Sequence, residues 1–188
     1  MSLDIRSEEG STFEQLLNEE TSVQLVSSTK MIKPQIVVRV NNQNIKAQFV
    51  RANKEGVLFF KVNSGTVPGK FWEVRVQFSN LPEAVKKMNG KLSFTAKSVI
   101  KSMARGDIKV YCNGHWWRYA CAYSAWKHGY GLYRETRPSR RWNPRNEKMV
   151  CKHVIAVCYL LPNISGQILR EYRRHKVVSL FIDKIRNR

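Results

Sequence analysis

Acidic residues are scarce in this sequence. Fourteen Asp and Glu stand against 33 Lys and Arg, which gives a formal net charge of +19. The imbalance between basic and acidic residues is greatest after residue 100, where there are 19 basic residues and only 5 acidic ones. Such an excess of positive charge indicates an anionic partner, most often nucleic acid. An acidic protein surface inside an assembly is an equally good interpretation.

Long apolar runs and cysteine-rich segments are also missing. No stretch approaches the roughly 18 apolar residues that a membrane span needs, and the acidic residues 1–20 lack the pattern of a signal peptide. We therefore expect a protein made in a cytoplasm, which is a reducing compartment, with no membrane partner. Four cysteines are too few for a disulfide scaffold. All four lie within residues 112–158, two of them close to histidines, which points to a metal.

The first half of the chain has the pattern of an antiparallel sheet. Its strand-like segments are rich in β-branched residues or alternate apolar and polar positions, as Ile45, Ala47 and Phe49 do. The predicted strands are 23–28, 34–41, 44–51, 56–63 and 70–79. In the last of these, Trp72, Val74, Val76 and Phe78 form the predicted core-facing stripe. Short helices are predicted near residues 12–20, 82–88 and 94–106.

The second half changes to a helical pattern. Its predicted elements are a strand at 107–112, an aromatic helix at 116–129 ended by Gly129, a basic loop at 130–148, an apolar helix at 149–162 stopped by Pro162, and one or two helices in 165–188. The prediction is therefore an α+β protein of two units. Residues 1–106 would form a β-rich domain with short helices, and residues 107–188 a small helical module.

Two Cys–His pairs are candidates for a metal site. Cys112 and His115 form a C-x2-H pair at a strand end, and Cys151 and His153 form a C-x-H pair at a helix start. Structural zinc takes four such ligands, usually as two close pairs brought together by the fold. Ordinary buried cysteines are the alternative, because free Cys is among the most buried residue types. Either of the other two cysteines, Cys121 first and then Cys158, could replace His115 as fourth ligand.

The region 105–162 resembles a family of virion structural proteins of large tailed bacteriophages. That family has a motif similar to the SWIM zinc domain: C-x-C-P-x-(F/W)-x-Y, a long insert, P-x-x-R-N-P and then C-K-H. The matching positions are Cys112, Trp117, Tyr119, Pro138, Asn143, Pro144, Cys151 and His153. Trp142 stands where the family usually has Arg.

One position departs from the family pattern. The second cysteine of the family motif corresponds to Gly114 in this sequence, and glycine has no side chain to bind metal. The next residue is His115, where the family has Pro. The resemblance therefore implies zinc, with His115 as the replacement ligand beside Cys112, Cys151 and His153. It also implies a location in the virion, among other virion proteins in a symmetric multi-copy assembly.

The basic loop is the candidate anion- or partner-binding segment. Its predicted contact residues are Arg134, Arg137, Arg140, Arg141, Trp142 and Arg145. Arginine and exposed aromatic side chains suit nucleic acid, and they equally suit a protein neighbour. No Ser/His/Asp set, phosphate loop or paired carboxylates stand out, so we expect no enzyme. The leading hypothesis is a zinc-stabilised structural component of a phage particle. The alternative is a zinc-dependent nucleic-acid-binding protein, and a zinc hydrolase is a weaker third option.

Overall fold

The computed structural model describes residues 23–29, 35–40, 42–53, 55–81, 107–147, 149–164, 166–171 and 174. The helices predicted at 12–20, 82–88 and 94–106 lie outside these residues, as does the chain after residue 174. Residues 166–171 are helical, and Ile168 and Leu169 are buried as predicted.

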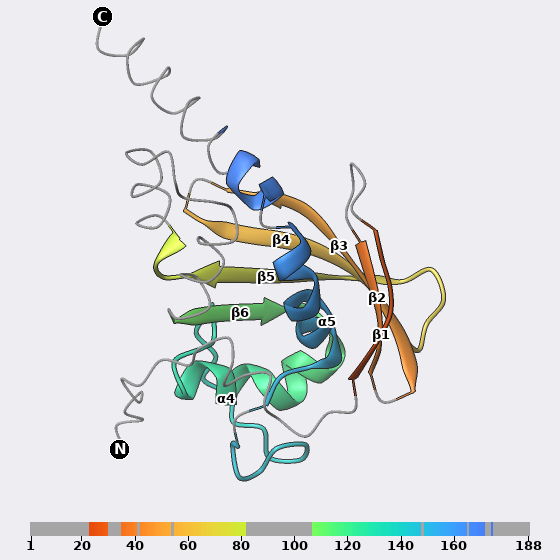
Figure 1. The fold of residues 1–188 in the computed structure, drawn as a ribbon. Helices are drawn as coiled ribbons and strands as arrows, with labels where there is room; N and C mark the ends of the chain where they lie inside the picture. Colours follow the sequence, from red (N-terminus) through yellow and green to blue (C-terminus); the bar gives the residue numbers. More distant parts are fainter. Residues whose placement is uncertain are drawn as a thin grey trace, which may run out of the picture.

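The strands form one antiparallel sheet in which each strand pairs with the next along the chain (Figure 1). They are β1 (Val23–Thr29), β2 (Gln35–Val40), β3 (Gln43–Ala52), β4 (Val57–Asn63), β5 (Phe71–Phe78) and β6 (Ile108–Cys112). The five strands predicted in the first half are confirmed. The strand predicted at 107–112 is also present, and it pairs with β5, Arg75 lying opposite Tyr111. The expected mixture of a β-sheet with helices is therefore observed.

Alternation of side chains gives the sheet one apolar face. Along β5, Val74, Val76 and Phe78 are buried, and Trp72 is partly buried against the same core. On β3, Ile45, Ala47 and Phe49 are buried, as the alternation predicts. The hairpin between β2 and β3 is tight, because Val40 pairs with Gln43 and Asn42 adopts a φ of 62°. Asparagine tolerates this left-handed conformation better than most residues.

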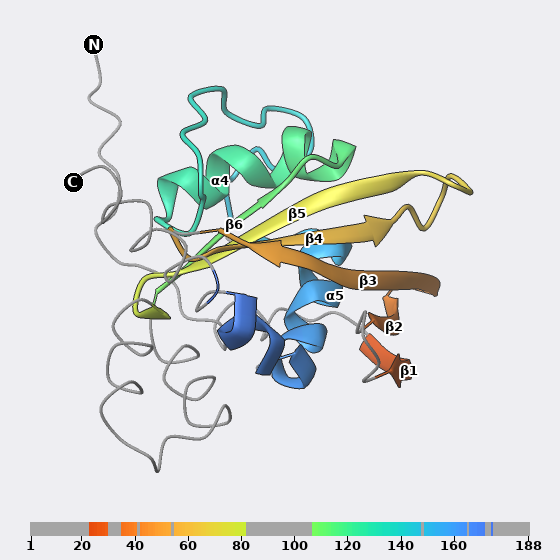
Figure 2. The same ribbon diagram turned by 90° about the horizontal axis from the view of Figure 1, so that it is seen from above.

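Two helices pack against this sheet from different sides. Helix α5 (Lys152–Leu160) contacts strands β2 to β6, and all but two of its residues are buried. It continues into a 3-10 turn, Leu161–Ile164. The predicted helix at 116–129 contains a π-helical turn, Trp117–Cys121, followed by α4 (Ala122–Lys127). Figure 2 shows α5 on one side of the sheet and α4 on the other, beside β6. No helix in the described ranges has the length and apolar character needed to cross a bilayer.

The residues on either side of position 106 share one sheet and one core. Strand β6 extends the sheet formed by β1 to β5, and α5 packs directly on those earlier strands. A single cluster of buried side chains includes Phe60 of β4, Val110 of β6, Trp117 and Leu160. The described parts of the two predicted units are therefore joined by continuous packing.

This shared core predicts one cooperative unfolding transition. Phe60→Ala on β4 and Leu160→Ala on α5 each remove a fully buried side chain. Each should lower the free energy of unfolding by about 3 kcal/mol in the same urea transition, followed by tryptophan fluorescence and by circular dichroism. Val50→Ala is the control, because Val50 is 55% exposed and should change stability by less than about 0.5 kcal/mol. Two separate transitions, each shifted by one variant only, would contradict the shared core.

Candidate metal centre

Three of the four predicted ligands lie together in the core. Cys112 ends β6, while Cys151 is the N-cap of α5 and His153 lies in its first turn. Their ligand atoms are all within 4.8 Å of one another, and the side chains are 1%, 1% and 5% exposed. Within the described ranges no other set of three such donors comes this close. The three residues can therefore hold a metal ion between the end of a strand and the start of a helix.

Gly114 forms part of the wall of this cluster. Its backbone N–H donates to the Cys112 Sγ over 3.3 Å. A Cβ atom at this position would stand 3.2 Å from the Cys112 Sγ and 3.2 Å from the His153 Nδ1. Both distances are shorter than comfortable van der Waals contact, so a larger residue would press on two of the three donors. Glycine leaves that space open.

The two thiols of the cluster do not ionise alike. Burial opposes ionisation of Cys151, but hydrogen bonds with Cys112 and His153 outweigh burial and hold the pKa of Cys151 well below its usual value. The same hydrogen bond with Cys151, together with burial, raises the pKa of Cys112 well above its usual value. The metal-free pair therefore favours one thiolate and one thiol. A cation bound between them would displace the remaining proton, as metal binding to cysteine generally does.

The ring of His153 has one nitrogen inside the cluster. Nδ1 lies 3.7 Å from the Cys112 Sγ, whereas Nε2 is buried without a hydrogen-bond partner. The ring of Trp72 lies next to it, with 6.1 Å between the centroids. Nδ1 is thus the nitrogen that faces the sulfur atoms, and Trp72 forms part of the apolar surroundings of the imidazole.

The remaining candidate ligands lie outside this group. His115 is exposed, and its ring contacts Trp72 at 5.5 Å between centroids, so it is near the cluster but does not belong to it. Cys121 is buried and raises the pKa of Cys112 electrostatically, yet it also falls outside the three. Cys158 is buried on α5, where burial raises its pKa to about 12. None of the four cysteines forms a disulfide.

The loop between the two pairs is held against the preceding helix by buried polar groups. The Asn143 side chain donates to the carbonyls of Ala120 and Glu147 and accepts from the Glu147 N–H. The Ser139 hydroxyl donates to the Tyr119 carbonyl and accepts from the Asn143 N–H. Sequence reasoning could pick out Asn143, because it matches a position of the motif quoted above. No sequence pattern singled out Ser139.

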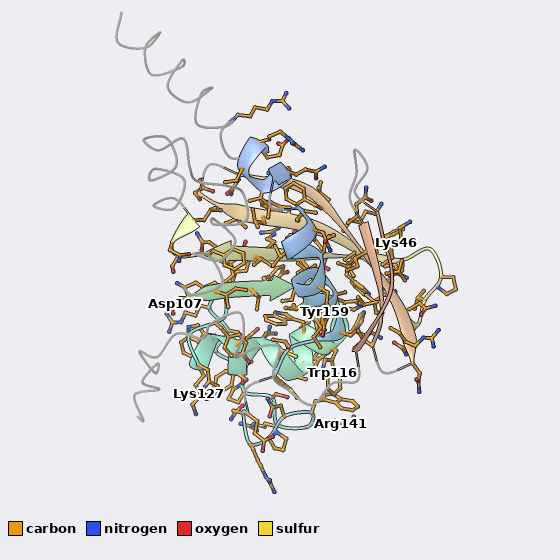
Figure 3. All side chains as sticks on the ribbon, in the orientation of Figure 1. Lys46, Asp107, Trp116, Lys127, Arg141 and Tyr159 are labelled. Atoms are coloured by element: carbon orange, nitrogen blue, oxygen red, sulfur yellow. The ribbon has the colours of Figure 1, made fainter. Side chains whose placement is uncertain are left out.

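The predicted contact residues of the loop are exposed. Some are already engaged with neighbours on the same surface: Arg137 pairs with Glu135 at 2.8 Å, Arg145 with Glu147 at 3.8 Å, and Arg141 lies over the Trp142 ring. Arg134 and Arg140 are exposed as well. Trp142 is 52% exposed and packs edge-on against Trp116 with 5.7 Å between the rings. Figure 3 shows Trp116 and Arg141 at the same end of the molecule.

Loss of either thiol should remove the metal. In protein purified without chelator, we expect the wild type to carry a divalent metal and Cys112→Ala and Cys151→Ala to lack it, as measured by elemental analysis. Cys158→Ala is the matched control, because Cys158 is equally buried on the same helix but lies outside the cluster. It should keep the metal. A wild-type protein without metal, or loss of metal in Cys158→Ala, would argue against this site.

Comparison with models of protein families, with curated proteins and with solved structures finds no match for this chain.

Proposed function

We propose that the metal is zinc and that Cys112, Cys151 and His153 bind it. Zinc prefers thiolate and imidazole donors. Tetrahedral bonds of about 2.3 Å to sulfur and about 2.1 Å to nitrogen separate the two donor atoms by roughly 3.6 Å. The Cys112 Sγ and the His153 Nδ1 are 3.7 Å apart. This agreement is the observation that best supports zinc.

The role proposed for this zinc is structural. All three ligands are buried, and they join the last strand of the sheet to the helix that covers it. A clamp of this kind can contribute on the order of 10 kcal/mol to folding. Three protein ligands leave a fourth position open, as in a catalytic zinc site, but a catalytic zinc also needs a nearby base. No carboxylate among the described residues belongs to the donor group.

The two histidines near the cluster give a sharp test of the ligand set. His153→Ala should weaken zinc binding by at least about 100-fold, because it removes a ligand. His115→Ala should weaken it by less than the roughly 10- to 100-fold typical of residues that bond to the ligands, because its ring contacts Trp72 rather than a ligand. Zinc affinity is measured by competition with a chelator. Equal losses in the two variants would make His115 a full ligand, as the family resemblance implies.

We further propose that the protein is a non-enzymatic structural component of an assembly, and that this assembly is a tailed-phage particle, as the family resemblance implies. Support comes from the aromatic–arginine face, defined as Trp116, Tyr119, Arg140, Arg141 and Trp142. Its three aromatic side chains are 44% to 52% exposed. Exposed Trp, Tyr and Arg in one patch are typical anchors of protein interfaces.

A nucleic-acid partner for the same loop is the second candidate. The arginines of the loop are exposed, and two of them lie over tryptophan rings: Arg134 over Trp126 and Arg141 over Trp142. Binding through these residues would weaken steeply with salt because counterions are released. The protein interface is preferred because Ser139 and Asn143 hold the loop on the helix, which makes it a shaped surface rather than a free arm.

Incorporation into particles tests the assembly role. Mass spectrometry of purified particles from the encoding phage should detect the protein, with cross-links from the aromatic–arginine face to a neighbouring subunit. A protein carrying Arg141→Ala and Trp142→Ala should be incorporated at least several-fold less, since both anchors are lost. Val67→Ala, which alters an exposed apolar residue outside this face, should be incorporated normally. Absence of the wild-type protein from particles would exclude the proposal.

A further inference from the structure

The sheet has a second face, and its composition differs from that of the core side. Alternate residues of β3 to β6 point away from the buried cluster, and directly paired positions bring them together: Arg51 opposite Phe59, Phe59 opposite Arg75, and Arg75 opposite Tyr111. We call this surface the outer sheet face. Figure 2 shows α5 on the other side of these strands, with α4 on this side only at the β6 end.

Positive charge dominates this face. Among the described positions of strands β3 to β6, the outward-pointing basic side chains are Lys46, Arg51, Lys61, Arg75 and Lys109. The outward-pointing acid among these positions is Glu73, which is already paired with Arg75 at 2.6 Å. The remaining cations of the strands are therefore not neutralised by acidic residues of the same strands. A surface of this kind attracts a polyanion.

Aromatic rings lie between these cations. The Arg51 guanidinium lies 3.9 Å from the centre of the Phe59 ring, and the Lys61 ammonium lies 4.0 Å from the centre of the Phe71 ring. Arg75 lies 5.3 Å from the same Phe59 ring. Phe71 is 48% exposed, which is unusual for a ring that could be packed in a core. The face thus offers flat groups for stacking, both phenyl rings and guanidinium planes, next to charges for phosphate.

The outer sheet face is hollowed and continues to the loop. The residues that line an open groove on this face include Val50, Arg51, Phe59, Lys61, Phe71, Glu73 and Asn113. Asn113 also lines a second hollow of about 220 Å³ beyond β6, together with Tyr133, Arg134 and Arg137. Arg75 donates to the Tyr133 hydroxyl, which connects the strands to that loop. One track of aromatic and basic side chains therefore crosses the strands and ends among the loop arginines.

We propose that the outer sheet face binds single-stranded nucleic acid, with bases stacked on Phe71 and on the Phe59–Arg51 pair, and phosphates held by Lys61. Stacking on rings and guanidinium planes is available only to unpaired bases, because paired bases are closed within the duplex. A surface that held only duplex phosphates would need the charges but not the exposed rings. The inference goes beyond the proposed assembly role, because it uses a different surface and a different class of partner.

The test is binding of the full-length, metal-loaded protein to a labelled oligothymidylate, followed by fluorescence anisotropy at several salt concentrations. Phe71→Ala should weaken binding about 10-fold, the loss expected for one stacked base, and Phe71→Trp should keep it. Lys61→Ala should weaken binding. It should also reduce the slope of the logarithm of the binding constant against the logarithm of the salt concentration by about one, because one fewer counterion is released. Tyr159→Ala is the control: its ring is 38% exposed but lies on α5, on the opposite side of the sheet, so binding should not change.

Competitors and stability measurements separate the possible failures. Unlabelled single strands should displace the probe, whereas duplex DNA and polyglutamate should displace it at least several-fold less well. Metal content and melting temperature should be unchanged in Phe71→Ala, since its ring is half exposed. Absence of binding, equal displacement by duplex DNA, or equal displacement by polyglutamate would overturn the proposal; the last would identify an acidic protein as the partner. Weakening by Tyr159→Ala but not by Phe71→Ala would also overturn it.

Discussion

The contact between the end of β6 and the start of α5 is the constraint on which the rest of the structure depends. Helix α5 is apolar on nearly all sides, so it must be covered by the sheet. Its first turn nevertheless carries Cys151 and His153, and the fold buries both against Cys112. A thiolate in such a place is costly unless a positive charge compensates it. The cluster has the donors to bind a cation that would compensate such a charge.

Several residues far apart in sequence serve this contact. Glycine suits position 114 because Cys112 and His153 occupy the space that a side chain there would need. Trp72, at the start of β5, places its ring beside His153. The chain must then return from β6 to α5, and Asn143 fixes that return by bonding to backbone groups of both the helix and the loop. A substitution at any of these positions should therefore alter the geometry of the cluster as well as the packing around the substituted residue.

Much of this arrangement could be predicted from local patterns. Alternation placed the strands, because each has one buried face, and the C-x2-H and C-x-H spacings indicated the cluster. His115 was harder to place: it follows the turn at Gly114 and opens the next helix, so its side chain lies at the surface rather than with Cys112. The continuity of the sheet across position 106 could not be foreseen, since strand pairing between β5 and β6 depends on the fold and not on spacing. In the sequence alone, the charged outer positions of the strands look like those of any solvent-exposed strand face. Only the strand pairing shows that they lie beside Phe59 and Phe71.

The two surfaces and the metal centre are linked through charge. A net charge of +19 destabilises the compact state by self-repulsion, and the strands supply little acid to relieve it. Anionic partners, as proposed for both surfaces, would offset that cost. Zinc held by two thiolates and an imidazole forms a neutral centre, so the proposed zinc would not reduce the repulsion itself; its binding free energy would offset that cost where the most basic half of the chain joins the sheet. In this view the metal does not contact a partner; it allows a small protein to remain folded while both its aromatic–arginine face and its outer sheet face stay positively charged.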